Sequence, residues 1–233
     1  MIIADLHGNL EAVRSLPSDY DELWVLGDLV NYGPNPAEVI EFVRANASVA
    51  VRGNHDHAIG CGQDPRCSAR FRRMADETAR FTRAAIDEDQ RRFLGSLPLT
   101  AGREVGGTRF LLCHAVPGNP LYEYRGPESG LWEEEASHLP ADILLAGHTH
   151  LPFLRSAGTR MVANPGSVGQ PKHGLAQACY AIWEDGSLRL ASREYPFEET
   201  VAKVRALPVS PEVRAGLETV LRTGSAKTLP PGS

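Results

Sequence analysis

The sequence lacks several features that mark particular classes of protein. None of its four cysteines forms a CxxC pair, so the usual motif of a structural zinc site is absent. No apolar stretch approaches the roughly 18 residues of a membrane span, and no signal peptide is recognisable. The formal net charge of −5 lacks the basic excess of dedicated nucleic-acid binders. We therefore expect a soluble, cytoplasmic protein with no membrane surface and no dedicated nucleic-acid surface.

The length and the cysteines limit the possible domain organisation and disulfide bonding. A chain of 233 residues with 42% hydrophobic residues can form one sizeable domain or two small ones. We predict a single domain over residues 1–223 and a flexible tail over 224–233. Only four residues precede Asp5, so the sequence leaves open whether the natural start lies upstream of Met1. Cys113 and Cys179 are predicted core residues, whereas Cys61 and Cys67 are expected to be reduced rather than bridged.

Five short apolar runs each lead into a turn that carries aspartate, asparagine or histidine. Such runs, followed by turn residues, are typical of buried strands. If several of these strands lie in one parallel sheet, their C-terminal ends share an edge, which is where open α/β sheets bind ligands. The turns are Asp5-Leu6-His7, Gly27-Asp28, Gly53-Asn54-His55-Asp56, His114 and Gly147-His148-Thr149-His150.

These side chains suit divalent metals of intermediate hardness. Imidazole nitrogen suits zinc, iron and nickel, and carboxylate oxygen suits manganese and magnesium. No cysteine belongs to the set, which argues against a structural zinc site. Pairs two residues apart, such as Asp5 and His7, can reach around one ion or two adjacent ions at the end of a strand.

The first half of the chain alternates between predicted strands and helices, which is typical of a parallel sheet. Asn9 is a predicted helix cap, and a second helix is expected over 37–46. Residues 60–98 break this rhythm as a helical insertion, with a helix that starts at Asp87 and has Gln90 as its capping-box partner. Six arginines lie between Arg66 and Arg83. We favour a solvated helix face, and the alternative is a lid whose arginines reach a phosphate.

The second half is dominated by predicted strands. Gly106 and Gly107 predict a hairpin turn before the strand that leads into His114. Two further hairpins, over residues 151–163 and 179–192, are expected to form a second, mixed sheet. A short acidic helix is predicted around residues 132–135, and an outer helix pair over 198–222.

Taken in order, the five turns resemble those of the calcineurin-like metallophosphoesterases. The stretch Asn164–Pro171, together with the compact length, is similar to the small bacterial and archaeal phosphodiesterase branch. The resemblance implies an α/β fold of four layers, an α-β-β-α sandwich of two mixed sheets. It also implies a dinuclear metal site at the C-terminal ends of the strands.

The resemblance also implies roles for single residues. One ion would be held by Asp5, His7 and His150, and the other by Asn54, His114 and His148. Asp28 would bridge the two ions, and His55 would act as general acid toward the leaving oxygen. Manganese is the favoured metal, with iron, zinc, cobalt or nickel as alternatives.

The chain departs from the protein-phosphatase branch at two positions. Asn31 and Tyr32 stand where that branch has an aspartate that orients the catalytic histidine and an arginine that grips phosphate. This departure disfavours a phosphoprotein phosphatase and favours a phosphodiester or a small nucleotide phosphate as substrate. Candidate substrate contacts are Asn31, Asn9 and His173, although Asn9 is first of all a helix cap.

Two other functions remain open for the sequence. A phosphomonoester or phosphoprotein phosphatase would need another phosphate-binding cation. A non-catalytic metal-binding scaffold on the same fold, like the related retromer subunit, would be expected to lose His55 or some of the ligands, and here every position is filled. The turn Asn164-Pro-Gly-Ser167 is expected to support the histidine loops.

Overall fold

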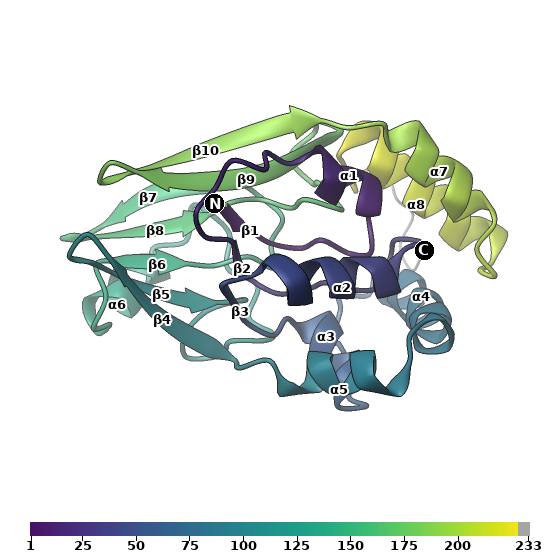
Figure 1. The fold of residues 1–233 in the computed structure, drawn as a ribbon, viewed down its shortest axis with the longest axis horizontal. Helices are drawn as coiled ribbons and strands as arrows, with labels where there is room; N and C mark the ends of the chain where they lie inside the picture. Colours follow the sequence, from purple (N-terminus) through teal and green to yellow (C-terminus); the bar gives the residue numbers. More distant parts are fainter. Residues whose placement is uncertain (228–233) are drawn as a thin grey trace.

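The computed structural model describes residues 1–227, and residues 228–233 of the predicted tail lie outside this range. Two five-stranded mixed sheets pack face to face, with helices on the outer faces (Figure 1). The predicted four-layer α/β sandwich is therefore confirmed. Among the described residues, no helix has the length and apolar character that crossing a bilayer requires.

The first sheet contains the three strands that lead into the first three metal-type turns. β1 (Ile2–Ile3), β2 (Trp24–Val25) and β3 (Val49–Ala50) are parallel neighbours. On the other side of β1 lies the hairpin of β9 (Gln177–Glu184) and β10 (Ser187–Glu194), with Ala181 paired antiparallel to Ile2. The expectation that this hairpin belongs to the second sheet is wrong, because the buried strand β1 needs a partner on both edges.

The second sheet carries the other two metal-type turns. Its strand order is β4 (Thr100–Val105), β5 (Thr108–Cys113), β6 (Ile143–Leu145), β8 (Arg160–Asn164) and β7 (Phe153–Ala157). β5, β6 and β8 run parallel, and antiparallel hairpins β4–β5 and β7–β8 form the edges. The hairpins predicted at Gly106–Gly107 and around Gly158 are both confirmed.

The core between the sheets is apolar and aromatic. Phe110 of the second sheet lies between Trp24 and Trp183 of the first sheet, with ring centroids 5.0 Å apart in both pairs. Cys113 and Cys179 are buried, as predicted, and all four cysteines are free thiols. The sheets are thus fixed against each other, which brings the ends of β1, β2 and β3 close to the ends of β5 and β6.

Helices cover both outer faces. α1 (Leu10–Ser15) and α2 (Pro36–Asn46) pack on the first sheet, and α6 (Leu131–Ser137) packs on the second. The Asn9 side chain accepts a hydrogen bond from the amide of Ala12, which confirms it as the cap of α1. α7 (Phe197–Arg205) and α8 (Pro211–Thr223) form the predicted C-terminal helix pair.

α3 (Asn54–Gly60) leads into the predicted insertion over residues 60–98, which forms α4 (Arg72–Ala85) and α5 (Glu88–Ser96). Asp87 and Gln90 form the predicted capping box at the start of α5. Met74 and Ala75 of α4 belong to one buried cluster with Val213 and Leu217 of α8. The insertion is therefore packed against the C-terminal helices along α4, and only the loop before α4 lies next to the predicted metal ligands.

Candidate metal centre

The backbone of the predicted ligand turns adopts a conformation that L-residues rarely take. Five ligand residues have positive φ angles: Asp5 (54°), His7 (45°), Asp28 (56°), His148 (66°) and His150 (60°). Such non-glycine residues cost of order 1–3 kcal/mol each and cluster at functional sites. Backbone hydrogen bonds between the turns hold this conformation, including those from the Asp5 amide to Gly27 and from the His7 amide to Asp28, both 3.0 Å.

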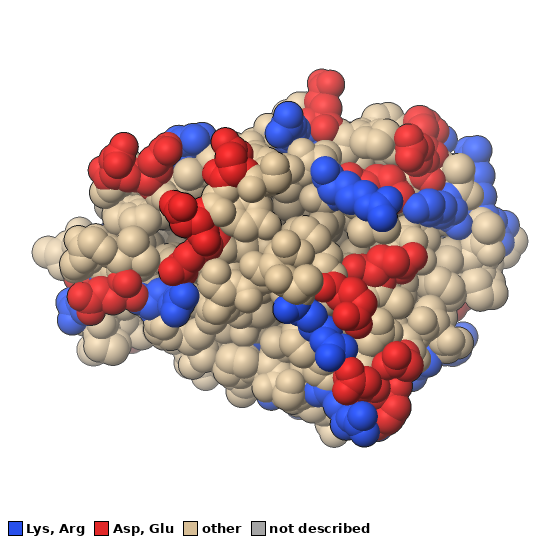
Figure 2. All heavy atoms as spheres, viewed as in Figure 1, with Lys and Arg blue, Asp and Glu red and all other residues tan. Residues whose placement is uncertain are grey.

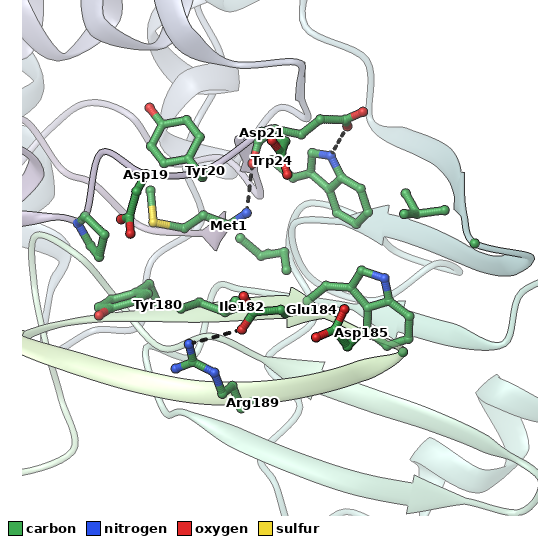
Figure 3. A pocket seen from close by; sticks show the side chains of 17 residues that line it. Met1, Asp19, Tyr20, Asp21, Trp24, Tyr180, Ile182, Glu184, Asp185 and Arg189 are labelled. Carbon is green, nitrogen blue, oxygen red and sulfur yellow. Dashed lines mark hydrogen bonds and ion pairs between the residues drawn. The ribbon is translucent and has the colours of Figure 1, made fainter.

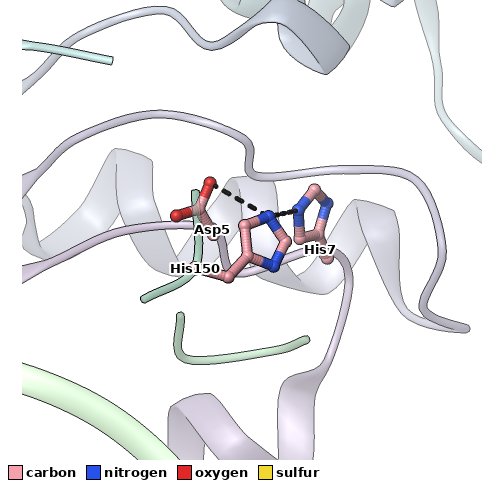
Figure 4. A group of neighbouring side chains, drawn as sticks. All are labelled: Asp5, His7 and His150. Carbon is pink, nitrogen blue, oxygen red and sulfur yellow. Dashed lines mark hydrogen bonds and ion pairs between the residues drawn. The ribbon is translucent and has the colours of Figure 1, made fainter. Parts of the chain in front are cut away.

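Asp5, His7 and His150 form the first group of side chains (Figure 4). His150 Nε2 lies 3.2 Å from His7 Nε2 and 3.6 Å from Asp5 Oδ1. All three side chains are buried. Burial lowers the pKa of His7 to about 3 and that of His150 well below its usual range, so both rings are neutral at physiological pH. Neutral imidazole is the form that binds metals.

The hydrogen bonds of this group show that it fits a cation. His7 Nδ1 lies 3.0 Å from the carbonyl of Val30, and His150 Nδ1 lies 2.6 Å from that of Gln170. Because a carbonyl only accepts, both Nδ1 atoms carry the proton and both Nε2 atoms expose lone pairs. These lone pairs face each other, and the buried Asp5 Oδ1 has no hydrogen-bond partner in the described chain. This arrangement of acceptors fits a divalent cation.

The second group has the same character. His114 Nδ1 lies 2.8 Å from the Leu26 carbonyl, which fixes the ring. Its Nε2 faces three acceptor-type atoms, at 3.0 Å from Asn54 Oδ1, 3.2 Å from His148 Nδ1 and 3.3 Å from Asp28 Oδ2. One proton cannot satisfy three acceptors, whereas one cation can bind all four groups. Burial opposes protonation of His114, yet the Asp28 carboxylate raises its pKa to about 9.

Asp28 lies between the two groups. Its Oδ2 atom is 3.3 Å from His114 Nε2 and 3.8 Å from His7 Nε2, so one carboxylate faces both sets of nitrogens. Burial opposes ionisation of Asp28, but the neighbouring His114 and His55 hold its pKa well below the usual range. The carboxylate is therefore ionised and available to both groups.

His55 is beside both groups without pointing at either. Its backbone amide donates to Asp28 Oδ1 over 2.9 Å, its Nδ1 is 2.8 Å from Asn31 Nδ2, and its Nε2 is 3.5 Å from Cys67 Sγ. The Asn31 side chain thus covers Nδ1, and Nε2 is the ring nitrogen that faces away from it. Burial lowers the pKa of His55, but Cys67 and Asp28 outweigh that effect and raise the pKa to about 8.

Asp56 is a functional residue to which the sequence analysis assigned no role. Its buried carboxylate accepts the backbone amides of Asp28 and Leu29, both over 2.8 Å, and of Gly53 over 3.0 Å. It thereby joins the turn after β2 to the start of α3. Burial and the nearby Asp28 raise the pKa of Asp56 to about 6, so it is ionised at neutral pH. Its place three residues after the cap position Gly53 was the available signal.

The turn after β8 supports the histidine loop, as expected. The Asn164 amide donates to the carbonyl of Gly147 over 2.6 Å, and its oxygen accepts from the amide of Gly166. The Ser167 hydroxyl donates to the backbone carbonyl of Asp5 over 2.8 Å. These contacts connect the loops that carry His148 and His150 to the first turn.

The predicted substrate contacts lie in three different places. Asn31 contacts the His55 ring at the centre of the site. Asn9 is buried and donates to the carbonyl of Gly169 and to the hydroxyl of Tyr195, away from the ligand atoms. His173 is half-buried with its ring nitrogens 3.7 Å from Cys179 Sγ. The side chains of Asn9 and His173 therefore contact structural neighbours, and only Asn31 contacts the central cluster.

Two residues next to the cluster carried no signal in the sequence. Cys67, in the loop before α4, lies 3.6 Å from the Tyr32 hydroxyl as well as beside His55. In the same loop, the Pro65 carbonyl accepts a hydrogen bond from the Asn54 side-chain amide over 2.7 Å. Lys172 follows the loop that holds His150, and its ammonium lies 4.4 Å from the Phe71 ring centroid. Both positions depend on how loops far apart in sequence meet.

A separate cavity lies away from these residues. It has a volume of about 760 Å³ and lies where β1 and β2 begin and β9 ends, opposite to the strand ends that carry the ligands (Figure 3). Acidic side chains such as Asp19 and Asp185 surround aromatic ones such as Trp24. On the face in Figure 2, acidic and basic side chains are interspersed without a broad basic patch.

Fold and site together define a class. Two stacked mixed sheets carry, at their strand ends, two buried His/Asp groups that face one shared carboxylate, and this donor set fits divalent metal ions. The sequence profile of the calcineurin-like phosphoesterase superfamily domain matches residues 1–185. The chain therefore belongs to the calcineurin-like phosphoesterase superfamily, as its motifs predicted.

Three relatives give the range of similarity. An uncharacterised protein of Methanocaldococcus jannaschii is 29% identical over 226 residues, which cover 87% of this chain and 90% of that protein. Phosphodiesterase YfcE of Escherichia coli strain K12 is 30% identical over 196 residues, or 75% of this chain and 81% of the relative. The crystal structure of a metallophosphoesterase from Sphaerobacter thermophilus superposes with a TM-score of 0.79 at 28% identity, covering 93% of this chain and 96% of that one.

Proposed function

We propose that the protein is a dinuclear-metal-dependent phosphodiesterase that hydrolyses a phosphodiester or a small nucleotide phosphate, with His55 as general acid. The observation that carries this proposal is the sharing of Asp28 by the two ligand groups, with Oδ2 3.3 Å from His114 Nε2 and 3.8 Å from His7 Nε2. Membership of the phosphoesterase superfamily supports the class of reaction, and the similarity to a named phosphodiesterase supports the diester.

In this proposal Asp5, His7 and His150 hold one ion, and Asn54, His114 and His148 hold the other. Two divalent ions in such a site supply an activated water and neutralise charge on the phosphoryl oxygens. Asp28 is the shared ligand. The mixed donor set of imidazole, carboxylate and amide accepts manganese, iron, zinc, cobalt or nickel, and we favour manganese.

The part of His55 is to give a proton to the leaving oxygen. It does so in its imidazolium form, from Nε2, because Nδ1 is covered by the Asn31 side chain at 2.8 Å. A neutral amide orients the ring without adding negative charge to it. The Nε2 atom faces Cys67 over 3.5 Å, so substrate binding requires the Cys67 side chain to give way to the leaving group.

A diester is favoured over a monoester because the site lacks the arginine that grips two phosphate oxygens in the phosphatase branch. Tyr32 stands where the phosphatase branch has its arginine, and its ring is 4.8 Å from the rings of both His7 and His55. A monoester dianion needs more positive charge around its free oxygens than a diester monoanion does. The retained His55 likewise favours an enzyme over a non-catalytic scaffold, since a scaffold has no use for a buried general acid.

The remaining expectations belong to the same proposal. The physiological partner is a small phosphorylated substrate, the protein acts in the cytoplasm, and residues 1–223 act as one domain. Neither a membrane nor a dedicated nucleic-acid surface takes part.

Hydrolysis of a matched pair of esters tests the proposal. Metal-stripped protein is assayed with bis-(p-nitrophenyl) phosphate and p-nitrophenyl phosphate, before and after each candidate metal is added back. We expect turnover only with metal and a higher kcat/KM for the diester. A clear preference for the monoester would refute the diester assignment, and metal-independent or absent turnover would refute the enzyme as proposed. His55→Ala is the matched variant and should lose about 10²- to 10⁴-fold in rate.

A further inference from the structure

Lys172 is a cation beside the candidate centre that lacks an anionic partner. Within residues 1–227 its ammonium makes no hydrogen bond or ion pair, and its nearest described contact is the face of the Phe71 ring at 4.4 Å. The side chain is partly buried. The ammonium nitrogen is not itself completely buried, so it can be reached by an anion that enters from solvent. A cation–π contact with Phe71 leaves its charge available to such an anion. A site that keeps such a group is suited to an anion from outside the chain.

Packing contacts place Lys172 next to the ligand groups. The Phe71 ring under its ammonium lies 6.4 Å from the ring of Tyr32, and the Tyr32 ring is 4.8 Å from that of His7. Burial lowers the pKa of His150, and Lys172 is the charge that lowers it most among its neighbours. Burial lowers the pKa of Lys172 to about 8, and the carboxylates of Asp5 and Asp28 oppose that effect. Its position is fixed by the same loop whose Gln170 carbonyl binds His150 Nδ1 over 2.6 Å.

Two arginines of the insertion, Arg72 and Arg73, are engaged elsewhere. Arg72 pairs with Asp64 at 2.7 Å and with Asp76 at 3.2 Å, on the exposed side of α4. Arg73 pairs with Glu77 at 3.0 Å, also on an exposed face. These contacts fit the solvated helix face favoured by the sequence. Lys172 is therefore the better placed cation for a phosphate.

We propose that Lys172 is the phosphate-binding cation of this site, an inference that rests on the proposed function. Its ammonium holds a non-bridging oxygen of the phosphodiester that the two ligand groups face. Lysine acts as a point charge and contacts one oxygen, whereas arginine grips two oxygens side by side. A single ammonium in place of the arginine thus matches a monoanionic diester, and Lys172 is a determinant of that substrate class.

Inorganic phosphate is a probe that reports on Lys172 without turnover. Binding of phosphate to metal-loaded protein is measured by calorimetry for wild type, Lys172→Met and Lys172→Arg, with Arg73→Met as a matched control on α4. Metal content and thermal unfolding are measured for every variant. We expect Lys172→Met to keep its metals and to bind phosphate about 10- to 100-fold more weakly, as for loss of a charged hydrogen bond.

The other variants and the ester kinetics complete the test. Lys172→Arg should bind phosphate within about threefold of wild type, because it keeps the charge, and Arg73→Met should be unchanged. With the diester, Lys172→Met should raise KM more than it lowers kcat, as expected for a group that binds ground state and transition state alike.

Three results would overturn the role of Lys172. They are a wild-type affinity in Lys172→Met with metals retained, an equal loss in Arg73→Met, and a wild-type protein that does not bind phosphate. Failure of the proposed function is distinguishable, because it is read from ester hydrolysis by the wild-type protein. A protein without ester turnover but with weaker phosphate binding in Lys172→Met would refute the function and retain the phosphate site.

Discussion

Asp56 provides the most quantitative prediction, because all of its contacts are backbone amides. Its Oδ2 accepts from Asp28 over 2.8 Å and from Gly53 over 3.0 Å, while Oδ1 accepts from Leu29 over 2.8 Å. The carboxylate is fully buried, so water cannot replace it. Hydrogen bonds to a charged group contribute about 1.5–3 kcal/mol each, and a buried amide left without a partner costs about 1–3 kcal/mol.

The two substitutions of Asp56 should therefore differ in a graded way. In Asp56→Asn the amide oxygen can keep the two bonds at the Oδ2 position, and its NH₂ group then opposes the Leu29 amide. We expect a loss of about 2–3 kcal/mol in the free energy of unfolding. Asp56→Ala removes all three acceptors and should lose about 4 kcal/mol or more. For a chain of this size, each kcal/mol lowers Tm by about 2–4 °C.

Urea unfolding of the metal-free protein, followed by circular dichroism, measures these losses. Asp56→Asn should shift the midpoint by about 1 M, given slopes of about 1–3 kcal/mol per molar urea. Asp89→Asn removes the same charge from an exposed pair with Arg44, 2.8 Å apart, and should unfold at the wild-type midpoint. A wild-type midpoint for Asp56→Asn, or equal shifts in Asp56→Asn and Asp89→Asn, would refute our claim that Asp56 stabilises the fold by joining the turn after β2 to the start of α3.

Two further predictions concern the residues around the centre. His55→Ala should retain the metal content of wild type, because His55 is proposed as acid and not as ligand. Asp28→Asn should lose both metal affinity and rate. Loss of metal from His55→Ala would contradict these roles. Asn31→Asp places a carboxylate against His55 Nδ1, 2.8 Å away in the present structure, and so raises the pKa of the imidazolium. The acid acts when protonated, and its activity is lost as pH rises through its pKa. The alkaline limb of the pH profile of kcat/KM should therefore move to higher pH by about one unit or more. An unmoved limb would show that His55 is not the acid.

The candidate ligand residues could be named from the sequence because they follow strands. Asp5, Asp28 and His114 each end an apolar run, so the fold only had to bring strand ends together. The cap at Asn9 and the capping box at Asp87 are local signals, and both predictions are confirmed. These capping hydrogen bonds join residues close in sequence, so they form in the folded chain wherever tertiary packing does not compete with them.

The errors and omissions concern contacts between distant segments. The hairpin over 179–192 joined the wrong sheet in the prediction, because the pairing of Ala181 with Ile2 is a choice that no local pattern encodes. Cys67 and Lys172 are isolated residues in loops, and only the folded chain places them beside His55 and the ligand groups. Burial and backbone amides around Asp56 are likewise visible only once two turns meet.

Metal titration of the stripped protein, with hydrolysis of bis-(p-nitrophenyl) phosphate measured at each addition, tests the central claim most directly. Seven side chains in two groups that share Asp28 should bind two ions per chain, and diester turnover should reach its maximum only as the second equivalent binds. Saturation of both binding and turnover at one equivalent, or turnover in protein that binds no metal, would contradict the dinuclear centre.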